Sequence, residues 1–208
     1  MAMEIAIGVA SFQGDVEEHL AALREAVKKI GVRGTVSTTR LPEEIESVDA
    51  VVIPGGESTV IAKLSSYKKS LDVLKNRINE GLPVLGTCAG LIMLARRVYD
   101  RVVGETGQPV LGVLDILVER NTYGRQRDSF EAQIDIPALG LKSFRAVFIR
   151  APAILETGPG VEVLASFADK PVAVRQGNIL GTTFHPELSG STVFHEELIR
   201  LATSYKSR

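Results

Sequence analysis

The chain contains the stretch Pro83-Val-Leu-Gly-Thr-Cys-Ala-Gly-Leu-Ile-Met-Leu94. The apolar residues before Gly86 predict a buried strand, and the apolar run from Ala89 predicts a helix. Gly86 and Gly90 stand two residues before and two residues after Cys88, which permits a tight reversal between the strand and the helix. This pattern is typical of a nucleophile elbow, with cysteine in the position that serine holds in many hydrolases.

The alternation of strand and helix recurs along the first half of the chain. Residues 4–10 predict a strand, and apolar residues at three- and four-residue steps then predict a helix from Val16 to Ile30, with Asp15 as its cap or first-turn acid and Gly31 as its stop. Further on, the pattern predicts a weak strand over 35–39, a strong one over 50–53 and mostly helix over 59–80. Such alternation predicts a three-layer α/β fold with a mostly parallel, doubly wound, flavodoxin-like sheet flanked by helices.

The second half of the chain is rich in strand signals. After Asp100 the β-rich segments are 113–119, 129–136, 146–149, 161–166, 172–175 and 179–183. They predict added antiparallel strands together with the last strands of the main sheet, and a closing helix begins near Ser191. A length of 208 residues suits one hydrophobic core, so we expect a single domain over 1–208.

Composition narrows the classes of partner. The chain carries 24 basic and 25 acidic side chains, so no strong positive field favours nucleic acid or an anionic membrane. Its single cysteine cannot form an intramolecular disulfide, and no Cys/His cluster has zinc-ligand spacing, so we expect no metal. The N-terminus lacks a secretory pattern, and the apolar stretch 83–95 is too short for a membrane span. We therefore expect a cytoplasmic protein whose partners are small molecules or another protein.

Cys88 is the candidate nucleophile. A helix that begins directly behind its sulfur offers free backbone N–H groups and a positive dipole end, and both favour a thiolate. The alternative is a small buried apolar side chain in a glycine-rich turn. The flanking glycines and the strand-to-helix context favour the nucleophile.

A thiolate that attacks a carbonyl also needs a proton shuttle, and His185 is the best placed of three histidines. It ends a predicted strand in Phe184-His-Pro-Glu187, and Pro186 keeps it extended. Residues two apart in an extended segment share a side, so Glu187 can orient the imidazole. A strand-terminal histidine before a proline turn is the structural alternative. We expect His19 on the polar side of the first helix and His195 on the solvated surface of the last one.

Two further segments suit a substrate site. The turn Pro54-Gly-Gly-Glu-Ser-Thr59 follows a predicted strand, and its backbone N–H groups could face an oxyanion. A phosphate cradle is disfavoured because no Gly-Lys-Ser/Thr follows, and a purely structural turn stays open. Either an arginine of the loop 119–128 or Arg150 could clamp a carboxylate, and spacing does not choose between them.

These motifs together resemble the class I, triad-type glutamine amidotransferases, through Gly86-Thr-Cys-Ala-Gly90 and His185-Pro-Glu187. The resemblance extends to the family of glutaminase subunits of pyridoxal 5'-phosphate synthase. It rests on Phe12-Gln-Gly-Asp15, Pro54-Gly-Gly-Glu-Ser-Thr59, Glu119-Arg-Asn-Thr-Tyr-Gly-Arg-Gln126, Phe148-Ile-Arg-Ala-Pro152 and Gly181-Thr-Thr-Phe-His-Pro-Glu-Leu188, which stand in the family's order over nearly the whole chain.

The resemblance implies a glutaminase that needs no cofactor of its own. It implies that L-glutamine is hydrolysed to L-glutamate and ammonia, and that a separate synthase subunit in a hetero-oligomer uses the ammonia to build the vitamin B6 coenzyme. Cys88 is then the nucleophile, His185 the general acid and base, and Glu187 its orienting carboxylate. The implied glutamine-binding residues are Gly56, Glu57, Ser58, Arg120, Ile149 and Arg150; backbone N–H groups near Gly56 and Ala89 form the oxyanion hole, and Gln13 lies near the interface and active site.

Two alternatives stay open at the level of sequence. The same triad could supply ammonia for imidazole or nucleotide synthesis, because the ammonia acceptor is not encoded in the active site. A non-enzymatic protein with a cysteine elbow, acting in redox sensing or as a chaperone, would leave the His-Pro-Glu segment without a purpose. In the relatives of that kind a histidine often follows the cysteine, whereas here Ala89 does.

Overall fold

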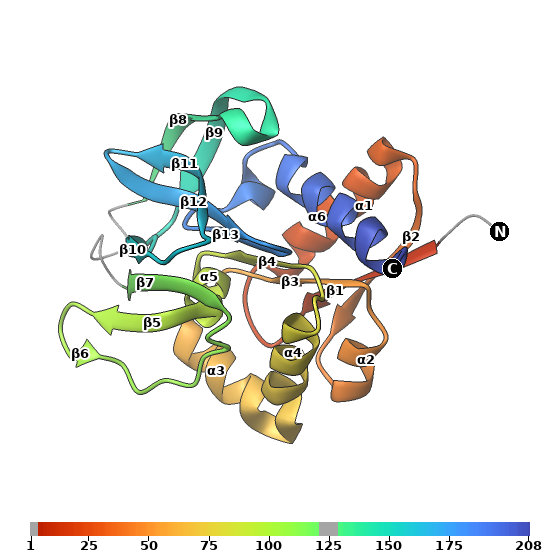
Figure 1. Ribbon diagram of the computed structural model, residues 1–208, viewed down its shortest axis with the longest axis horizontal. Coiled ribbons are helices and arrows are strands. Elements are labelled where there is room, and N and C mark those ends of the chain that lie inside the picture. The colour runs from red at the N-terminus through yellow and green to blue at the C-terminus, as the bar shows by residue number, and fades with distance from the viewer. Residues whose placement is uncertain (1–3, 121–128) are drawn as a thin grey trace.

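A computed structural model describes residues 4–120 and 129–208 and has a central sheet with helices on both sides (Figure 1). The strand order is β11-β12-β13-β4-β3-β1-β2. The strands are β1 Glu4–Ala10, β2 Arg33–Thr39, β3 Ala50–Ile53, β4 Val84–Thr87, β11 Glu162–Phe167, β12 Lys170–Gln176 and β13 Ile179–Thr182.

The parallel part of this sheet confirms the predicted fold class. Strands β2, β1, β3, β4 and β13 pair in parallel in that order, which is the 2-1-3-4-5 arrangement of flavodoxin-like doubly wound folds. Strands β12 and β11 extend the sheet antiparallel beyond β13. The carboxyl ends of β4 and β13 therefore meet at one edge of the sheet, which is where such folds bind ligands.

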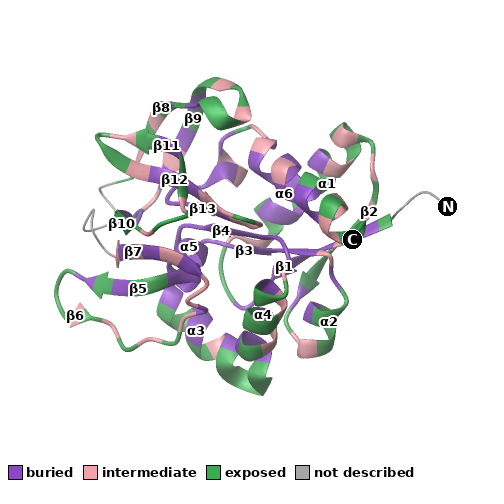
Figure 2. Cartoon of the chain, viewed as in Figure 1, coloured by how far each residue is buried: buried purple, intermediate pink, exposed green. Residues whose placement is uncertain are grey.

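Helices cover both faces of the sheet. Helices α1 (Val16–Ile30) and α6 (Val193–Lys206) lie on one face, and α3 (Ser58–Ser66), α4 (Ser70–Asn79) and the short α2 (Pro42–Glu46) lie on the other (Figure 1). Side chains of β3 alternate between two apolar clusters: Ala50 and Val52 face one, and Val51 and Ile53 face the other. Figure 2 shows β3 and β4 buried along their length, as strands covered on both faces must be.

Two smaller sheets carry the second half of the chain. One has the order β10-β7-β5-β6, with β5 Ala95–Asp100, β6 Gly104–Glu105, β7 Leu114–Arg120 and β10 Ala153–Thr157; the other is the hairpin of β8 Phe130–Ile136 and β9 Leu141–Phe148. The strand signals behind β7, β8 and β9 are confirmed. Strands β5, β6 and β10 were not predicted. Strand β5 was missed because it follows helix α5 (Ala89–Leu94) directly, with no glycine or proline between them to end the helical pattern.

The helix predicted over 59–80 is two helices. A short 3-10 turn, η1 (Tyr67–Lys69), separates α3 from α4, and Lys68 and Lys69 have φ angles of 58° and 62°. Neither is a glycine, so the sequence gives no signal of this break. By contrast, Gly31 ends α1 in the left-handed conformation, with a φ of 76°, as predicted. No helix within residues 4–120 and 129–208 is both long and apolar enough to cross a bilayer.

Candidate active site

Cys88 occupies a strained turn between β4 and α5. Its φ is 50°, an unusual value for a side chain with a Cβ, and its backbone N–H donates to the carbonyl of Thr182 at 2.9 Å. A Cβ on Gly90 would lie 1.9 Å from the Ile53 oxygen, and one on Gly86 would lie 2.7 Å from the Gly90 oxygen. Both flanking positions therefore require glycine, and the turn has the backbone of a nucleophile elbow.

His185 follows β13 and reaches the same place from the neighbouring strand. Its backbone is extended, and its N–H donates to the carbonyl of Val147 at 2.8 Å. Glu187 was expected in an extended segment but lies in the 3-10 turn η4 (Pro186–Leu188). Its Oε1 is 2.7 Å from His185 Nδ1. Cys88 acts on His185 as one of the groups that raise its pKa, and Cys88 Sγ lies 3.8 Å from the Ile149 oxygen.

The charges around His185 favour its protonated form. Burial by itself would lower the pKa of His185, but hydrogen bonds to Asp15, Cys88 and Glu187 outweigh it and raise the pKa to about 12. The imidazole is therefore an imidazolium at neutral pH. Burial raises the pKa of Glu187, whereas the hydrogen bond to His185 lowers the pKa of Asp15. One histidine is thus held between two carboxylates and a thiol.

A pocket of about 270 Å³ opens in front of this cysteine and histidine. Its lining residues include both positive and negative side chains, which complement the carboxylate and the ammonium group of an amino acid. The positive ones are Arg120 and Arg150, and the negative ones are Asp15 and Glu57. The pocket is lined by Gln13, Gly14, Asp15, Gly56, Glu57, Ser58, Cys88, Ala89, Ile92, Arg120, Ile149, Arg150 and His185. Every residue that the sequence assigned to the site lines this pocket except Glu187, which lies behind His185 with a fully buried side chain.

The comparison with known proteins covers nearly the whole chain. The profile of the SNO glutamine amidotransferase family matches residues 9–204. The chain belongs to this family. The pyridoxal 5'-phosphate synthase subunit PdxT of Nitrosopumilus maritimus is 45% identical over 204 residues, which cover 98% of this chain and all of the relative. The PdxT of Sulfolobus acidocaldarius is 49% identical over 190 residues, which cover 91% of this chain and 95% of the relative.

A solved structure agrees with the family assignment. A crystal structure described as a glutamine amidotransferase is 43% identical, covers 95% of this chain and 98% of its own, and superposes with a TM-score of 0.81. A crystal structure described as a glutamine amidotransferase from Thermotoga maritima shares the fold at a TM-score of 0.59 and 14% identity, and the match covers all of this chain and 85% of the other. The fold thus extends to proteins whose sequences have diverged widely.

In this member of the family, the turn Gly55–Gly56 after β3 packs directly against Asp15 and His185. The Gln13 side-chain oxygen accepts a hydrogen bond from the Glu57 N–H at 2.7 Å, and the Gly55 carbonyl accepts one from the Asp15 N–H at 3.4 Å. A Cβ on Gly55 would lie 2.4 Å from His185 Cε1, and Gly56 has a φ of 147°. Neither position accepts a side chain easily, so the turn can bring backbone close to the sulfur.

Arg120 is held by two residues that sequence reasoning missed. Its Nε lies 2.8 Å from Asp100 Oδ2, and its Nη1 donates to Gln108 Oε1 at 2.8 Å. Asp100 ends β5, a strand that was not predicted, so no local signal links it to Arg120. The remainder of the predicted arginine loop, residues 121–128, lies outside the described residues.

Two expectations about individual side chains were wrong. His19 and His195 were expected on polar or solvated faces, but both are completely buried. Their rings contact each other between α1 and α6. His195 was expected at the surface because Glu196 and Glu197 follow it in the sequence. Asp15 occupies the N-cap position of α1, as predicted, but its carboxylate makes no capping hydrogen bond and lies 3.2 Å from His185 Nδ1.

Proposed function

We propose that this glutamine amidotransferase hydrolyses L-glutamine to L-glutamate and ammonia through a triad of Cys88, His185 and Glu187. The observation that supports it most directly is one pocket lined by Cys88 and His185, with His185 Nδ1 at 2.7 Å from Glu187. The relatives are named as pyridoxal 5'-phosphate synthase subunits, so a separate synthase subunit in a hetero-oligomer is the proposed recipient of the ammonia. The proposed compartment is the cytoplasm.

The reaction begins with the thiolate of Cys88 and the imidazolium of His185. The sulfur attacks the side-chain amide carbon of glutamine, and the carbonyl oxygen becomes an oxyanion. The imidazolium then gives its proton to the amide nitrogen, the C–N bond breaks, and ammonia leaves a thioester behind. The now neutral His185 takes a proton from water, hydroxide attacks the thioester, and glutamate leaves with the thiolate and imidazolium restored. Glu187 stabilises the ring whenever it is positively charged and holds its orientation in both states.

Backbone N–H groups stabilise the oxyanion. Ala89 supplies one from the start of α5, and Gly56 supplies the other from the turn after β3. One such donor typically contributes about 3 kcal/mol to transition-state stabilisation. The Gly55–Gly56 turn is the part of the hole that can rotate without moving a side chain, and we expect the synthase to order it so that its N–H points at the oxyanion.

The remaining pocket residues bind the amino-acid end of glutamine. Arg120 and Arg150 are the candidate partners of the substrate carboxylate, and Glu57 is the candidate partner of the substrate ammonium group. Ser58, Ile149 and the backbone of Gly56 complete the wall. Because Asp100 and Gln108 already hold Arg120 in place, its guanidinium is oriented before substrate arrives.

The decisive test is glutamine hydrolysis by wild type and Cys88→Ala, each with the cognate synthase present. We expect the variant to lose essentially all turnover and to keep its binding to the synthase, because only a sulfur atom is removed. A glutamine analogue with an electrophilic diazoketone should label Cys88 in the wild type and leave the variant unlabelled. Residual turnover at wild-type level in Cys88→Ala would exclude the mechanism.

Activation by the synthase has its own test. Glutamine turnover is measured for the wild-type chain with and without the synthase, at equal concentrations of the glutaminase. We expect a large increase with the synthase, since the turn that completes the oxyanion hole is then ordered. Equal and high rates under both conditions would contradict ordering of the Gly55–Gly56 turn by the partner.

A further inference from the structure

Two buried histidines lie behind the triad, and the mechanism above gives neither a role. His19 comes from α1 and His195 from α6, and the exposed fraction of each is zero. His19 Nδ1 and His195 Nε2 are 3.0 Å apart, so the rings are joined by a hydrogen bond. Two imidazoles in an apolar interface between helices are costly to bury unless their nitrogens are used.

The pair reaches the triad through Glu187. His19 Nε2 lies 3.1 Å from Thr87 Oγ1 and 3.3 Å from Glu187 Oε2. The other carboxylate oxygen of Glu187 is the one bonded to His185. Glu187 Oε2 is buried and has no well-aligned hydrogen bond to the residues that the structure describes, so the 3.3 Å approach of His19 Nε2 is an electrostatic contact. The carboxylate is therefore flanked by an imidazole on each side.

Burial keeps both histidines of this pair neutral. Burial, followed by electrostatic interactions with His195 and His185, lowers the pKa of His19 well below its usual value, and burial lowers the pKa of His195 to about 4. At neutral pH each ring therefore carries one proton, and the tautomer decides which nitrogen donates.

The hydrogen-bond partners of His19 and His195 determine which tautomer each ring adopts. If His19 carries its proton on Nε2, it donates toward Thr87 and Glu187, and its Nδ1 accepts from His195 Nε2–H. The remaining nitrogen, His195 Nδ1, has no partner among the described residues and is then a bare acceptor. The opposite assignment would bury an unpaired N–H at that nitrogen and point the lone pair of His19 at a carboxylate, which costs more.

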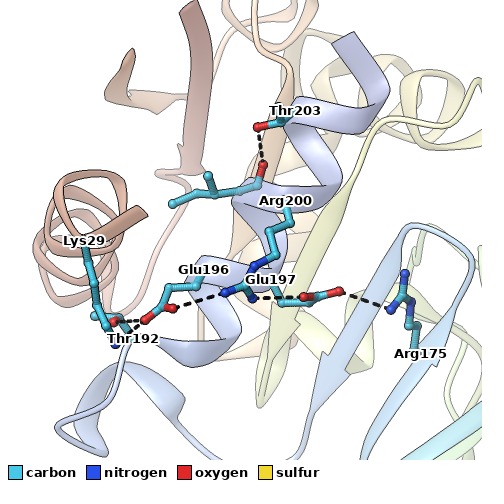
Figure 3. Close-up of polar contacts among 8 residues, drawn as sticks. Lys29, Arg175, Thr192, Glu196, Glu197, Arg200 and Thr203 are labelled. Atoms are coloured by element: carbon cyan, nitrogen blue, oxygen red, sulfur yellow. Dashed lines mark hydrogen bonds and ion pairs between the residues drawn. The ribbon is translucent and has the colours of Figure 1, made fainter. Parts of the chain in front are cut away.

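Ion pairs near the start of α6 hold His195 against α1. Glu196 pairs with Lys29 of α1 at 2.6 Å, and Glu197 pairs with Arg175 of β12 at 3.2 Å. Figure 3 shows Glu196 and Glu197 extending in opposite directions from α6 toward these two cations. The helix is thus fixed on both sides of the histidine, and the donor to His19 is fixed with it.

We propose that His19, with its tautomer set by His195, is a positioning residue that holds the Glu187 carboxylate in line with His185. The inference rests on the proposed triad. His19 touches neither substrate nor the reacting sulfur and acts through Glu187 alone. The titratable groups that act on His19 come from two parts of the fold: His185 and Glu187 after β13, and His195 in α6.

The test compares His19→Gln with His19→Leu in glutamine hydrolysis with the synthase present. The amide of glutamine can place an N–H near the position of Nε2, whereas leucine cannot. For His19→Leu we expect kcat to fall about 10- to 100-fold with KM changed less than about threefold, as for other groups that orient a catalytic residue. His19→Gln should recover most of kcat.

The pH profile separates positioning from stability. Loss of the N–H destabilises the Glu187 carboxylate, so its pKa rises and the acid limb of kcat/KM moves to higher pH, by about one unit in His19→Leu. The limb should return toward its wild-type position in His19→Gln. Equal losses in both variants with an unmoved limb would mean that His19 only stabilises the fold, and the proposal would be wrong.

A measurement on the wild-type chain does not depend on whether the variants fold. Nitrogen NMR of uniformly labelled histidine distinguishes protonated from bare ring nitrogens, and we expect both His19 and His195 to carry their proton on Nε2. A proton on His19 Nδ1 overturns the proposal. If the wild type hydrolyses glutamine but His19→Leu matches it, only the positioning role fails; if the wild type does not hydrolyse glutamine, the proposed function fails.

Discussion

His185 and His195 are both buried histidines in one chain, yet their surroundings move their pKa values in opposite directions. At the pocket, hydrogen bonds to Asp15, Cys88 and Glu187 overcome burial and raise the pKa of His185 to about 12. Between α1 and α6, burial dominates and lowers the pKa of His195 to about 4. Burial alone therefore does not decide the charge of a histidine here; for His185 the hydrogen bonds to its neighbours outweigh burial, and for His195 they do not.

The strongest way to break this contrast is to remove the charge of Glu187. In Glu187→Gln the side chain keeps its size, but the amide cannot stabilise the imidazolium. We expect kcat to fall about 10³- to 10⁴-fold, as for triads that lose their carboxylate. The measurement is glutamine hydrolysis with the synthase present.

The matched control is Asp15→Asn. Asp15 Oδ2 lies farther from His185 Nδ1, at 3.2 Å, and its side chain is 38% exposed, so water screens its charge. We expect a loss of no more than about tenfold. If Asp15→Asn costs as much as Glu187→Gln, the two carboxylates share the orienting role and Glu187 is not its main bearer.

Gly55→Ala tests the position of the His185 ring, whereas the two preceding variants test the charges next to it. The new methyl would lie 2.4 Å from His185 Cε1 and 2.8 Å from Asp15 Oδ2, so the imidazole must leave its present position. A displacement of this kind can cost about 100-fold in rate. Gly107→Ala is the control, because a Cβ there meets no atom within 4 Å. Near-normal turnover in Gly55→Ala would show that the ring tolerates the shift.

The buried pair predicts a pH dependence of stability with the opposite sign to that of His185. Because the folded-state pKa of His195 is depressed, the unfolded chain binds more protons between pH 6.5 and about 4, and the free energy of unfolding falls as pH falls through this window. One such group adds a slope of about 1.4 kcal/mol per pH unit. His185, with a raised pKa, instead contributes stability below pH 6.5 that is lost as pH rises toward about 12.

His195→Phe should flatten the acid side of that stability curve. Urea unfolding of the wild type and the variant, at several values between pH 7 and 4, measures the slopes, and the variant's should be smaller by up to the contribution of one proton. The curve above pH 7 should keep its shape. Parallel curves across the acid range would mean that His195 is protonated in the folded protein.

Local sequence patterns predicted much of the fold and most of the candidate site. Each strand followed by a helix in the first half carries its own signal, and Gly86, Cys88 and Gly90 report their turn without reference to distant residues. The pairing of His185 with Glu187 was also predicted, but the 3-10 turn η4 brings the carboxylate to the ring where an extended backbone was expected. Hydrophobic periodicity did not reveal the break at Lys68 or the start of β5, because neither glycine nor proline marks the change at those two places.

The sequence alone determined which residue types stand at the ends of the strands, because each strand and the turn after it carry a local pattern of their own. Only the tertiary structure decided which polar side chains lie inside. His19 and His195 stand among charged neighbours in the chain, yet α1 and α6 turn them toward each other and toward Glu187. Asp100 reaches Arg120 only because β5 and β7 pair. The burial and the protonation state of a histidine depend on the groups that packing brings near it. His19 and His195 are 176 positions apart in the chain, so no local sequence pattern predicts their contact.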